Sequence, residues 1–214
     1  MKIAPQAWRF AIPAVLVGAA GLWLAVRPGA APAGIALAAL GFLAGGFTLY
    51  FFRDPERPAP TDAGKLYSPG DGTVLSVAHE DGGAVVLRIF LSVFNVHVQR
   101  APCAGEVVKV ETIPGSFAAA MKDEARANSR VAVTLDPGAG RGPVVVEQIA
   151  GLIARVIECW PKAGERLAAG QRYGIIYFGS QAAVRFPPQA RCTVKPGDKV
   201  VAGVTEIGEW TGKR

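Results

Sequence analysis

The sequence predicts a mainly β fold of the α+β class, in which a hairpin of two transmembrane helices precedes a β-rich domain. Three observations predict it. Residues 1–52 contain only three charged residues and no acid, although the whole chain of 214 residues carries a net charge of +6. The sequence beyond them changes to short runs rich in Val and Ile. Gly, Pro and Asp separate these runs, and regular short strands bounded by such turn residues are typical of a sandwich or a barrel.

Two uncharged runs, residues 10–26 and 28–52, form the predicted membrane anchor. At 1.5 Å per helical residue they span roughly 25 Å and more than about 30 Å, enough to cross a bilayer core of about 30 Å. Basic residues flank the outer ends, whereas the intervening turn has only Arg27, so both termini are expected in the cytoplasm. The flanking basic residues are Lys2, Arg9, Arg53 and Arg57. The expected location is the inner cell membrane, with the β domain on its cytoplasmic side. Two alternatives to the membrane hairpin remain: the first run could be a signal peptide, or the two runs could form a buried pair of helices in a globular protein.

Composition divides the chain into an anchor at residues 1–52, a proline-rich linker at 53–66 and the β domain at 67–214. The linker is not expected to be helical, because proline lacks a backbone donor and restricts the residue before it. The expected strands are residues 73–78, 84–93, 106–113, 130–135, 143–149, 173–178, 183–186 and 199–207. Residues 116–128 have a helical composition, and residues 149–159 fit either a strand or a short helix.

Two segments of the β domain, residues 161–170 and 195–203, resemble one another. Each contains Lys and Pro, then Gly, an acid, a basic residue and an apolar residue, and each ends in Ala-Gly. The pattern resembles the turns of lipoyl- and biotinyl-type domains, so the β domain is predicted to be barrel-sandwich-like. Those carrier domains present a lysine for a prosthetic group at a hairpin tip. No such tip occurs in this sequence, so the resemblance concerns the fold and does not fix a function.

The composition argues against several kinds of partner. A nucleic-acid surface is not expected, because Lys and Arg do not cluster with stacking aromatic residues. No metal site is expected, since the two histidines and Cys103, Cys159 and Cys192 lack the spacing of ligands. An odd number of cysteines also argues against a disulfide framework and is typical of a reducing compartment.

A Gly-Ser pair, Gly179 and Ser180, is the first candidate for chemistry, because it lies between two apolar runs that are expected to be strands. A Gly-Ser pair is most often a simple turn. That explanation is preferred for the other such pair in this domain, Gly115 and Ser116, which follows a proline.

His97 and Asp71 are the other candidates. Strand alternation places His97 on the face opposite Val96 and Val98, although a lone histidine in a strand is more often a structural residue. Asp71 lies in a Gly-Asp-Gly sequence, where aspartate is by default a turn former. Taken alone, neither residue identifies a site.

The order of these motifs resembles that of the phosphatidylserine decarboxylase proenzymes, specifically the short pyruvoyl-dependent form. No single motif is specific, but the whole set in this order is. The segments that carry the resemblance are residues 50–57, 68–72, 95–102, 114–117, 128–130, 148–155, 178–180 and 194–200. The sequence departs from the family pattern at Arg100, where some members have a second histidine, and at Gln181, where many have arginine.

The resemblance implies a chain that cuts itself. The Ser180 hydroxyl would attack the carbonyl of Gly179, and β-elimination would then separate residues 1–179 from residues 180–214. Ser180 would become a covalent pyruvoyl group, which forms a Schiff base with the substrate. His97 is implied as the base for cleavage and as a proton donor, with Asp71 orienting it.

The implied function is conversion of phosphatidylserine to phosphatidylethanolamine, with a phospholipid substrate, the membrane, and two chains of one precursor that form a heterodimer or a larger oligomer. The cofactor would carry the difficult step while the protein orients it. Arg53, Arg57 and Lys65 are expected to attract anionic headgroups, at about 1 kcal/mol each. The alternative is a membrane-tethered barrel-sandwich module that binds a partner without catalysis.

Overall fold

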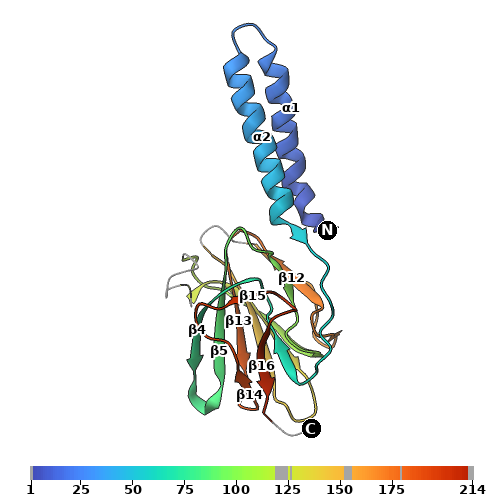
Figure 1. The fold of residues 1–214 in the computed structure, drawn as a ribbon, viewed down its shortest axis with the longest axis vertical. Helices are drawn as coiled ribbons and strands as arrows, with labels where there is room; N and C mark the ends of the chain where they lie inside the picture. The colour runs from blue at the N-terminus through green and yellow to red at the C-terminus, as the bar shows by residue number, and fades with distance from the viewer. Residues whose placement is uncertain (1, 119–124, 126, 152–155, 179, 212–214) are drawn as a thin grey trace. The chain divides into compact units, whose positions relative to one another are not determined.

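The structure, a computed structural model, describes residues 2–118, 125, 127–151, 156–178 and 180–211 (Figure 1). The chain divides into two compact units, Met1–Glu56 and Arg57–Arg214. The first is helical and the second is built mainly of strands, which confirms the predicted fold class. The division after Glu56 falls within the predicted linker, residues 53–66.

The first unit is a helical hairpin. Helix α1 spans Trp8–Ala25 and follows a short 3-10 helix at Pro5–Ala7, and helix α2 spans Ala31–Phe51. Both helices are long and apolar enough to cross a membrane. Strand β1 (Lys2–Ile3) pairs with β2 (Arg53–Asp54), so the two ends of the hairpin are joined by a short antiparallel ladder.

Glycines allow the two helices to approach closely. A Cβ atom added at Gly34 would overlap with the backbone of Ala25, and one added at Gly41 would overlap with the backbone of Gly18. Small residues at such crossings allow the backbones of membrane helices to touch, which maximises van der Waals contact where no hydrophobic driving force operates. The sequence pattern therefore provides both the length of the helices and the face on which they pack.

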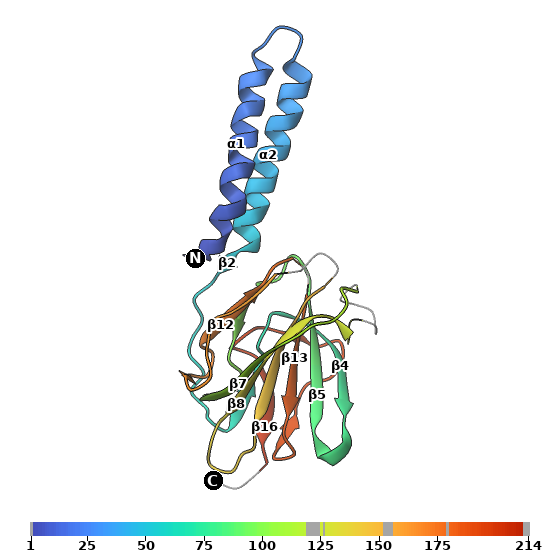
Figure 2. The same cartoon turned by 180° about the vertical axis from the view of Figure 1, so that it is seen from behind.

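The second unit is centred on an antiparallel sheet of eight strands, which Figures 1 and 2 show from opposite sides as twisted and curled. Its strands in hydrogen-bonded order are β11 (Arg166–Leu167), β7 (Gly105–Ile113), β8 (Arg130–Asp136), β9 (Val144–Ile149), β13 (Ser180–Phe186), β5 (Val85–Leu91), β4 (Gly72–His79) and β15 (Lys199–Val200). Six of the eight strands correspond to expected runs, and β13 lies at the centre between β9 and β5.

Two sheets of three strands complete the unit. One consists of β10 (Ile157–Cys159), β12 (Arg172–Ile176) and β6 (Val98–Arg100). The other consists of β14 (Ala190–Cys192), β16 (Glu206–Trp210) and β3 (Lys65–Tyr67), and a 3-10 turn at Asp81–Gly83 joins β4 to β5. Alternate residues of the central strands form the core; on β13 these are Ala182, Val184 and Phe186.

The two similar segments occupy equivalent places at the two edges of the large sheet. Gly164 N donates to the carbonyl of Val107 at 2.8 Å, and Gly197 N donates to that of Val74 at 2.9 Å. Each bond joins the turn before an edge strand, β11 or β15, to the neighbouring strand, β7 or β4. The internal resemblance in the sequence therefore corresponds to a structural repeat, as expected for a barrel-sandwich-like domain.

One local expectation is wrong. Residues 199–207 do not form one strand, because the turn at residues 201–205 separates β15 from β16 and contains Gly203 at a φ of 67°. Residues 96–103 are all buried, and only 98–100 of them belong to a strand, so burial does not distinguish the face of His97 from that of Val96 and Val98.

The two ambiguous segments are described only in part. Residues 119–124 and 126 of the helical-composition segment lie outside the described residues, and its ends, Ser116 and Asn128, are joined by a β-bridge. Between β9 and β10, residues 152–155 also lie outside the described residues.

Candidate active site

Ser180 is the first residue of β13, where it pairs with Leu91 of β5. Strand alternation directs its side chain to the same face as Ala182 and Val184, which belong to the core, and Ser180 is fully buried. Its hydroxyl oxygen has no hydrogen-bond partner among the described residues. A buried hydroxyl is normally paired, so an unpaired one needs an explanation, and a role in chemistry is one such explanation.

The backbone is strained just before the Gly-Ser pair. Phe178 has a φ of 56°, the left-handed region that a bulky residue seldom adopts. Gly179 itself lies outside the described residues. Strain of this kind persists only where the surrounding structure enforces it, and it is common at functional sites.

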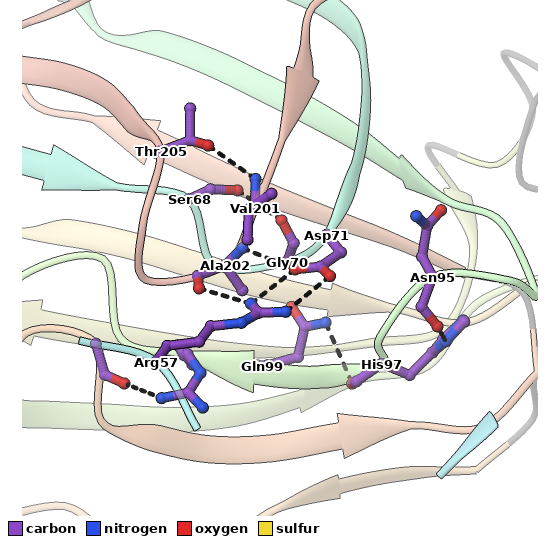
Figure 3. A network of polar contacts seen from close by, with 12 residues as sticks. Arg57, Ser68, Gly70, Asp71, Asn95, His97, Gln99, Val201, Ala202 and Thr205 are labelled. Atoms are coloured by element: carbon purple, nitrogen blue, oxygen red, sulfur yellow. Dashed lines mark hydrogen bonds and ion pairs between the residues drawn. The ribbon is translucent and has the colours of Figure 1, made fainter. Parts of the chain in front are cut away.

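The imidazole of His97 is buried and held in one orientation. Its Nδ1 atom lies 3.0 Å from the carbonyl oxygen of Asn95, as Figure 3 shows. A carbonyl can only accept, so Nδ1 carries the proton in this contact. In the neutral ring the lone pair is then on Nε2, which makes that atom the base.

Two backbone contacts place His97 and Ser180 at the same end of the second unit. Ser180 pairs with Leu91, and the amide of Ile176 donates to the carbonyl of His97 at 3.4 Å. The segment at residues 91–97 is therefore fixed to the segment at residues 176–180 at both ends. Ser180 and His97, the nucleophile and the base that the family resemblance implies, lie on these two segments.

Asp71 lies at the same end of the large sheet, in the loop before β4. Arg57 holds its carboxylate through two bonds, Nη1 to Oδ1 at 2.7 Å and Nη2 to Oδ2 at 2.8 Å. The amide of Ala202 also donates to Oδ1 at 2.8 Å, and the carbonyl of Ala202 accepts from Nη1 of Arg57 at 2.6 Å. Figure 3 shows this closed set of contacts, in which both charged side chains are largely buried.

The structure does not join Asp71 to His97 by a contact among those described. Gln99 lies between their segments: its Nε2 donates to the carbonyl of His97 at 3.3 Å, and a Cβ added at Gly70 would lie 3.2 Å from the Gln99 amide. The described partner of the ring is Asn95 and the described partners of the carboxylate are Arg57 and Ala202. Orientation of His97 by Asp71 therefore stays a prediction.

Comparison with known proteins decides the family. A family model described as phosphatidylserine decarboxylase matches residues 44–208. The chain belongs to the phosphatidylserine decarboxylase family. This confirms the resemblance inferred from the motifs.

Curated relatives agree with this family assignment. A phosphatidylserine decarboxylase proenzyme of Symbiobacterium thermophilum is 43% identical over 213 residues, which covers 96% of this chain and 94% of the relative. One of Burkholderia mallei is 47% identical over 169 residues, covering 76% and 78%. One of Desulfotalea psychrophila is 42% identical over 174 residues, covering 78% and 81%. These matches favour a decarboxylase, and nothing in them favours the non-catalytic binding module.

The sequence pattern did not predict the ion pair of Arg57 with Asp71. Arg57 was expected to attract headgroups, but its side chain is only 8% exposed and is engaged with Asp71. Lys65 is also ion-paired, since its Nζ lies 3.0 Å from Glu209 and 3.4 Å from Glu206, and its attraction of headgroups stays a prediction. The signal that could have identified Arg57 is its place in one of the family segments, because a charged residue within such a motif more often belongs to a site than to a bare surface.

The cysteines lack the character of nucleophiles. Cys103, Cys159 and Cys192 are all free thiols. Burial raises the pKa of Cys103 to about 12 and that of Cys159 to about 11, so both are protonated near neutral pH. Within the described part of the chain, no group of three or more His, Cys, Asp or Glu side chains is arranged to hold a metal ion.

Proposed function

We propose that this chain is the precursor of a phosphatidylserine decarboxylase, which cuts its own backbone between Gly179 and Ser180 and then converts phosphatidylserine to phosphatidylethanolamine. The observation that carries the proposal is the hydroxyl of Ser180, which is buried and has no hydrogen-bond partner among the described residues. It lies where the family motif has its Gly-Ser pair and two residues after the strained backbone of Phe178.

The proposed cleavage begins when Nε2 of His97 accepts the proton of the Ser180 hydroxyl. The oxygen attacks the carbonyl carbon of Gly179, the C–N bond breaks, and the proton passes to the new amine, which converts the amide to an ester. Removal of the α-proton of residue 180 then breaks the Cβ–O bond, and residues 1–179 leave as a carboxylate. Water converts the dehydroalanine at position 180 to a pyruvoyl group and ammonia. Serine needs such a base because its free hydroxyl is a weak nucleophile.

Residue 180 suits a pyruvoyl group because it is fully buried at the start of a central strand, and its side-chain oxygen is not used in the described structure. The group supplies a carbonyl that withdraws electrons as the substrate loses carbon dioxide. His97 would hold a proton for the product carbon, since imidazole titrates near neutrality. Both residues are fully buried, which limits the access of bulk water to the reacting atoms.

The two chains are proposed to remain together after cleavage. Residues 180–214 provide β13, β14, β15 and β16, and β13 is hydrogen-bonded on both sides, to β5 and to β9. Separation would expose the core residues Ala182, Val184 and Phe186 and leave two ladders unpaired. A stable heterodimer of a large and a small chain is the expected product.

The anchor is proposed to lie in the inner cell membrane with the catalytic unit on the cytoplasmic side. Lys2 and Arg9 precede the span of α1, and Arg53 follows α2, whereas the turn between the helices has only Arg27. Short loops rich in Lys and Arg stay in the cytoplasm. A two-chain lipid is held in a bilayer, so an anchored enzyme is suited to reach it.

Denaturing electrophoresis of the wild-type chain and of Ser180→Ala tests the cleavage. The wild type should give fragments of residues 1–179 and 180–214, the smaller without a reactive terminal amine, and Ser180→Ala should stay intact. Ser116→Ala is the matched control, because it removes the serine of the other Gly-Ser pair and should leave cleavage unchanged. A cut Ser180→Ala chain, or an uncut wild-type chain that decarboxylates the lipid, would refute the proposal.

The roles of the other two residues are tested in the same way. His97→Ala should block cleavage, and Asp71→Asn should slow it. Normal cleavage in the His97 variant would remove that histidine from the processing step, while leaving the assignment of Ser180 unchanged.

A further inference from the structure

The contacts between Arg57, Asp71 and Ala202 form a closed network that joins three distant parts of the chain. Arg57 is the first residue of the catalytic unit, Asp71 lies in the loop before β4, and Ala202 lies in the turn between β15 and β16. Each member contacts both of the others: Arg57 bonds to the carboxylate and to the carbonyl of Ala202, and the amide of Ala202 bonds to the carboxylate. Such a network fixes a carboxylate more firmly than a single ion pair can.

The network uses most of the accepting capacity of Asp71. A carboxylate has about four lone-pair positions. Oδ1 accepts from Nη1 of Arg57 and from the amide of Ala202, which fills both of its positions. Within the described residues, Oδ2 accepts from Nη2 of Arg57, so one position remains. Arg57 therefore determines the plane of the Asp71 carboxylate. It also determines the one direction from which Oδ2 of Asp71 can accept a further hydrogen bond.

The surrounding backbone prevents Asp71 from turning to compensate. The hydroxyl of Ser68 donates to the carbonyl of Gly70 at 2.7 Å, and Gly70 packs against the Gln99 amide, where a Cβ would lie at 3.2 Å. At Gly72 a Cβ would overlap with the carbonyl oxygen of Phe90. Residues on both sides of Asp71 are thus tightly packed, so the side-chain contacts with Arg57 decide where its oxygens lie.

We propose that Arg57 is a positioning residue for self-cleavage: it fixes the orientation of the Asp71 carboxylate, on which the rate of cleavage depends. This rests on the proposed role of Asp71. The network also joins the two sides of the cleavage site, because Arg57 and Asp71 belong to residues 1–179 and Ala202 belongs to residues 180–214. The same network would therefore keep the small chain aligned with the site after cleavage.

Time courses of cleavage of the full-length chain, synthesised in the presence of membranes, test this inference. Arg57→Ala should slow cleavage about tenfold or more, the scale on which partners of site residues act. Added guanidinium ion, at concentrations far below those that unfold proteins, should restore part of that rate by pairing with Asp71. Asp71→Asn should not respond to guanidinium. Arg185→Ala is the control, because Arg185 lies on β13 and pairs with Glu80 at the surface, so its loss leaves Asp71 untouched.

Arg57→Lys is the second variant, since it retains the charge but cannot span three acceptors in the manner of a guanidinium. It should have the melting temperature of the wild type and cleave more slowly. If Arg57→Ala does not fold, Arg57→Lys still tests the proposal. Cleavage of either variant at the rate of Arg185→Ala would overturn the inference, as would a slow Arg57→Ala that guanidinium fails to restore. If Ser180→Ala were still cut, the proposed function itself would fail. If only Asp71→Asn were cut normally, this inference alone would fail.

Discussion

The Nδ1 atom of His97 lies 3.0 Å from the carbonyl oxygen of Asn95, two residues earlier in the chain. This carbonyl is held in place by a turn in which Ser92 and Asn95 are joined by two hydrogen bonds. The amide of Ser92 donates to Oδ1 of Asn95 at 2.9 Å, and the amide of Asn95 donates to the carbonyl of Ser92 at 2.8 Å. The tautomer of the histidine is thus set by a local turn.

Asn95→Ala is expected to slow self-cleavage, by about tenfold, because the loosened turn no longer holds the carbonyl that keeps Nε2 of His97 as the base. Asn95→Asp retains an accepting oxygen and should cleave at nearly the wild-type rate. The measurement is the fraction of chain cut as a function of time. Phe94→Ala changes the same turn at a side chain that is 64% exposed and serves as the control. Equal rates for Asn95→Ala and Phe94→Ala would show that the turn does not set the base.

The strain at Phe178 leads to a prediction that separates backbone from side chain. A residue with a Cβ atom in the left-handed region costs roughly 1–2 kcal/mol, a cost that glycine avoids. If this strain raises the energy of the uncut chain, Phe178→Gly should cleave up to about tenfold more slowly than Phe178→Ala, because a difference of 1.4 kcal/mol changes a rate tenfold. Both variants lose the ring, so their ratio isolates the backbone. Indistinguishable rates would exclude a contribution of strain to cleavage.

The anchor and most strands could be predicted from the sequence because their signals are local. Charge-free runs predict helices of membrane length, and short apolar runs between turn residues predict strands such as β8 and β9. The split of residues 199–207 could not be predicted from alternation, because the apolar residues continue through the turn. That turn is held by tertiary contacts, among them the bond from the amide of Gly203 to the carbonyl of Ser68.

The site could be predicted only in part, for a related reason. Ser180, His97 and Asp71 stand in family motifs, so their residue types carried a signal. The partner of His97 is a backbone carbonyl, which every residue possesses, and a sequence pattern cannot single out one of them. The pair of Arg57 with Asp71 also depends on the folded turn at Ala202, 131 residues after Asp71. Contacts that the tertiary structure creates between unremarkable groups leave no pattern in the chain.

The ion pairs of β16 predict a pH-dependent contribution to stability. The neighbouring Lys65 and then Arg191 lower the pKa of Glu209 from its ordinary value of 4.5, and Glu209 raises the pKa of Lys65 from 10.5. The stability that Glu209 contributes is therefore fully present above pH 4.5 and is lost as the pH falls through the lowered pKa of the folded protein. The stability that Lys65 contributes is fully present below pH 10.5 and is lost as the pH rises through its raised pKa. Because the groups are partly exposed, the effect should be small.

Glu209→Gln should accordingly lower the melting temperature of the solubilised protein near neutral pH by a few degrees at most, and by less at an acid pH below the lowered pKa of Glu209, where the wild-type carboxylate is neutral as well. Added salt should reduce the difference near neutral pH, because it screens exposed charges. An equal loss at both pH values would mean that Glu209 acts through packing and not through its charge.

The packing of the membrane hairpin predicts opposite responses at two glycines of the same helix. A Cβ atom at Gly41 would overlap with the backbone of Gly18, whereas one at Gly46 has no atom within 4 Å beyond the backbone of its own helix. Gly41→Ala should push the helices apart and destabilise the hairpin, by about 1–3 kcal/mol, the usual cost of overpacking. Gly46→Ala should be neutral or slightly stabilising, because alanine favours helix more than glycine does. Unfolding of the hairpin by sodium dodecyl sulfate in mixed micelles measures both variants. Because the helical propensity changes equally in the two, a Gly41→Ala hairpin as stable as Gly46→Ala would mean that α1 and α2 do not pack through this face in the membrane.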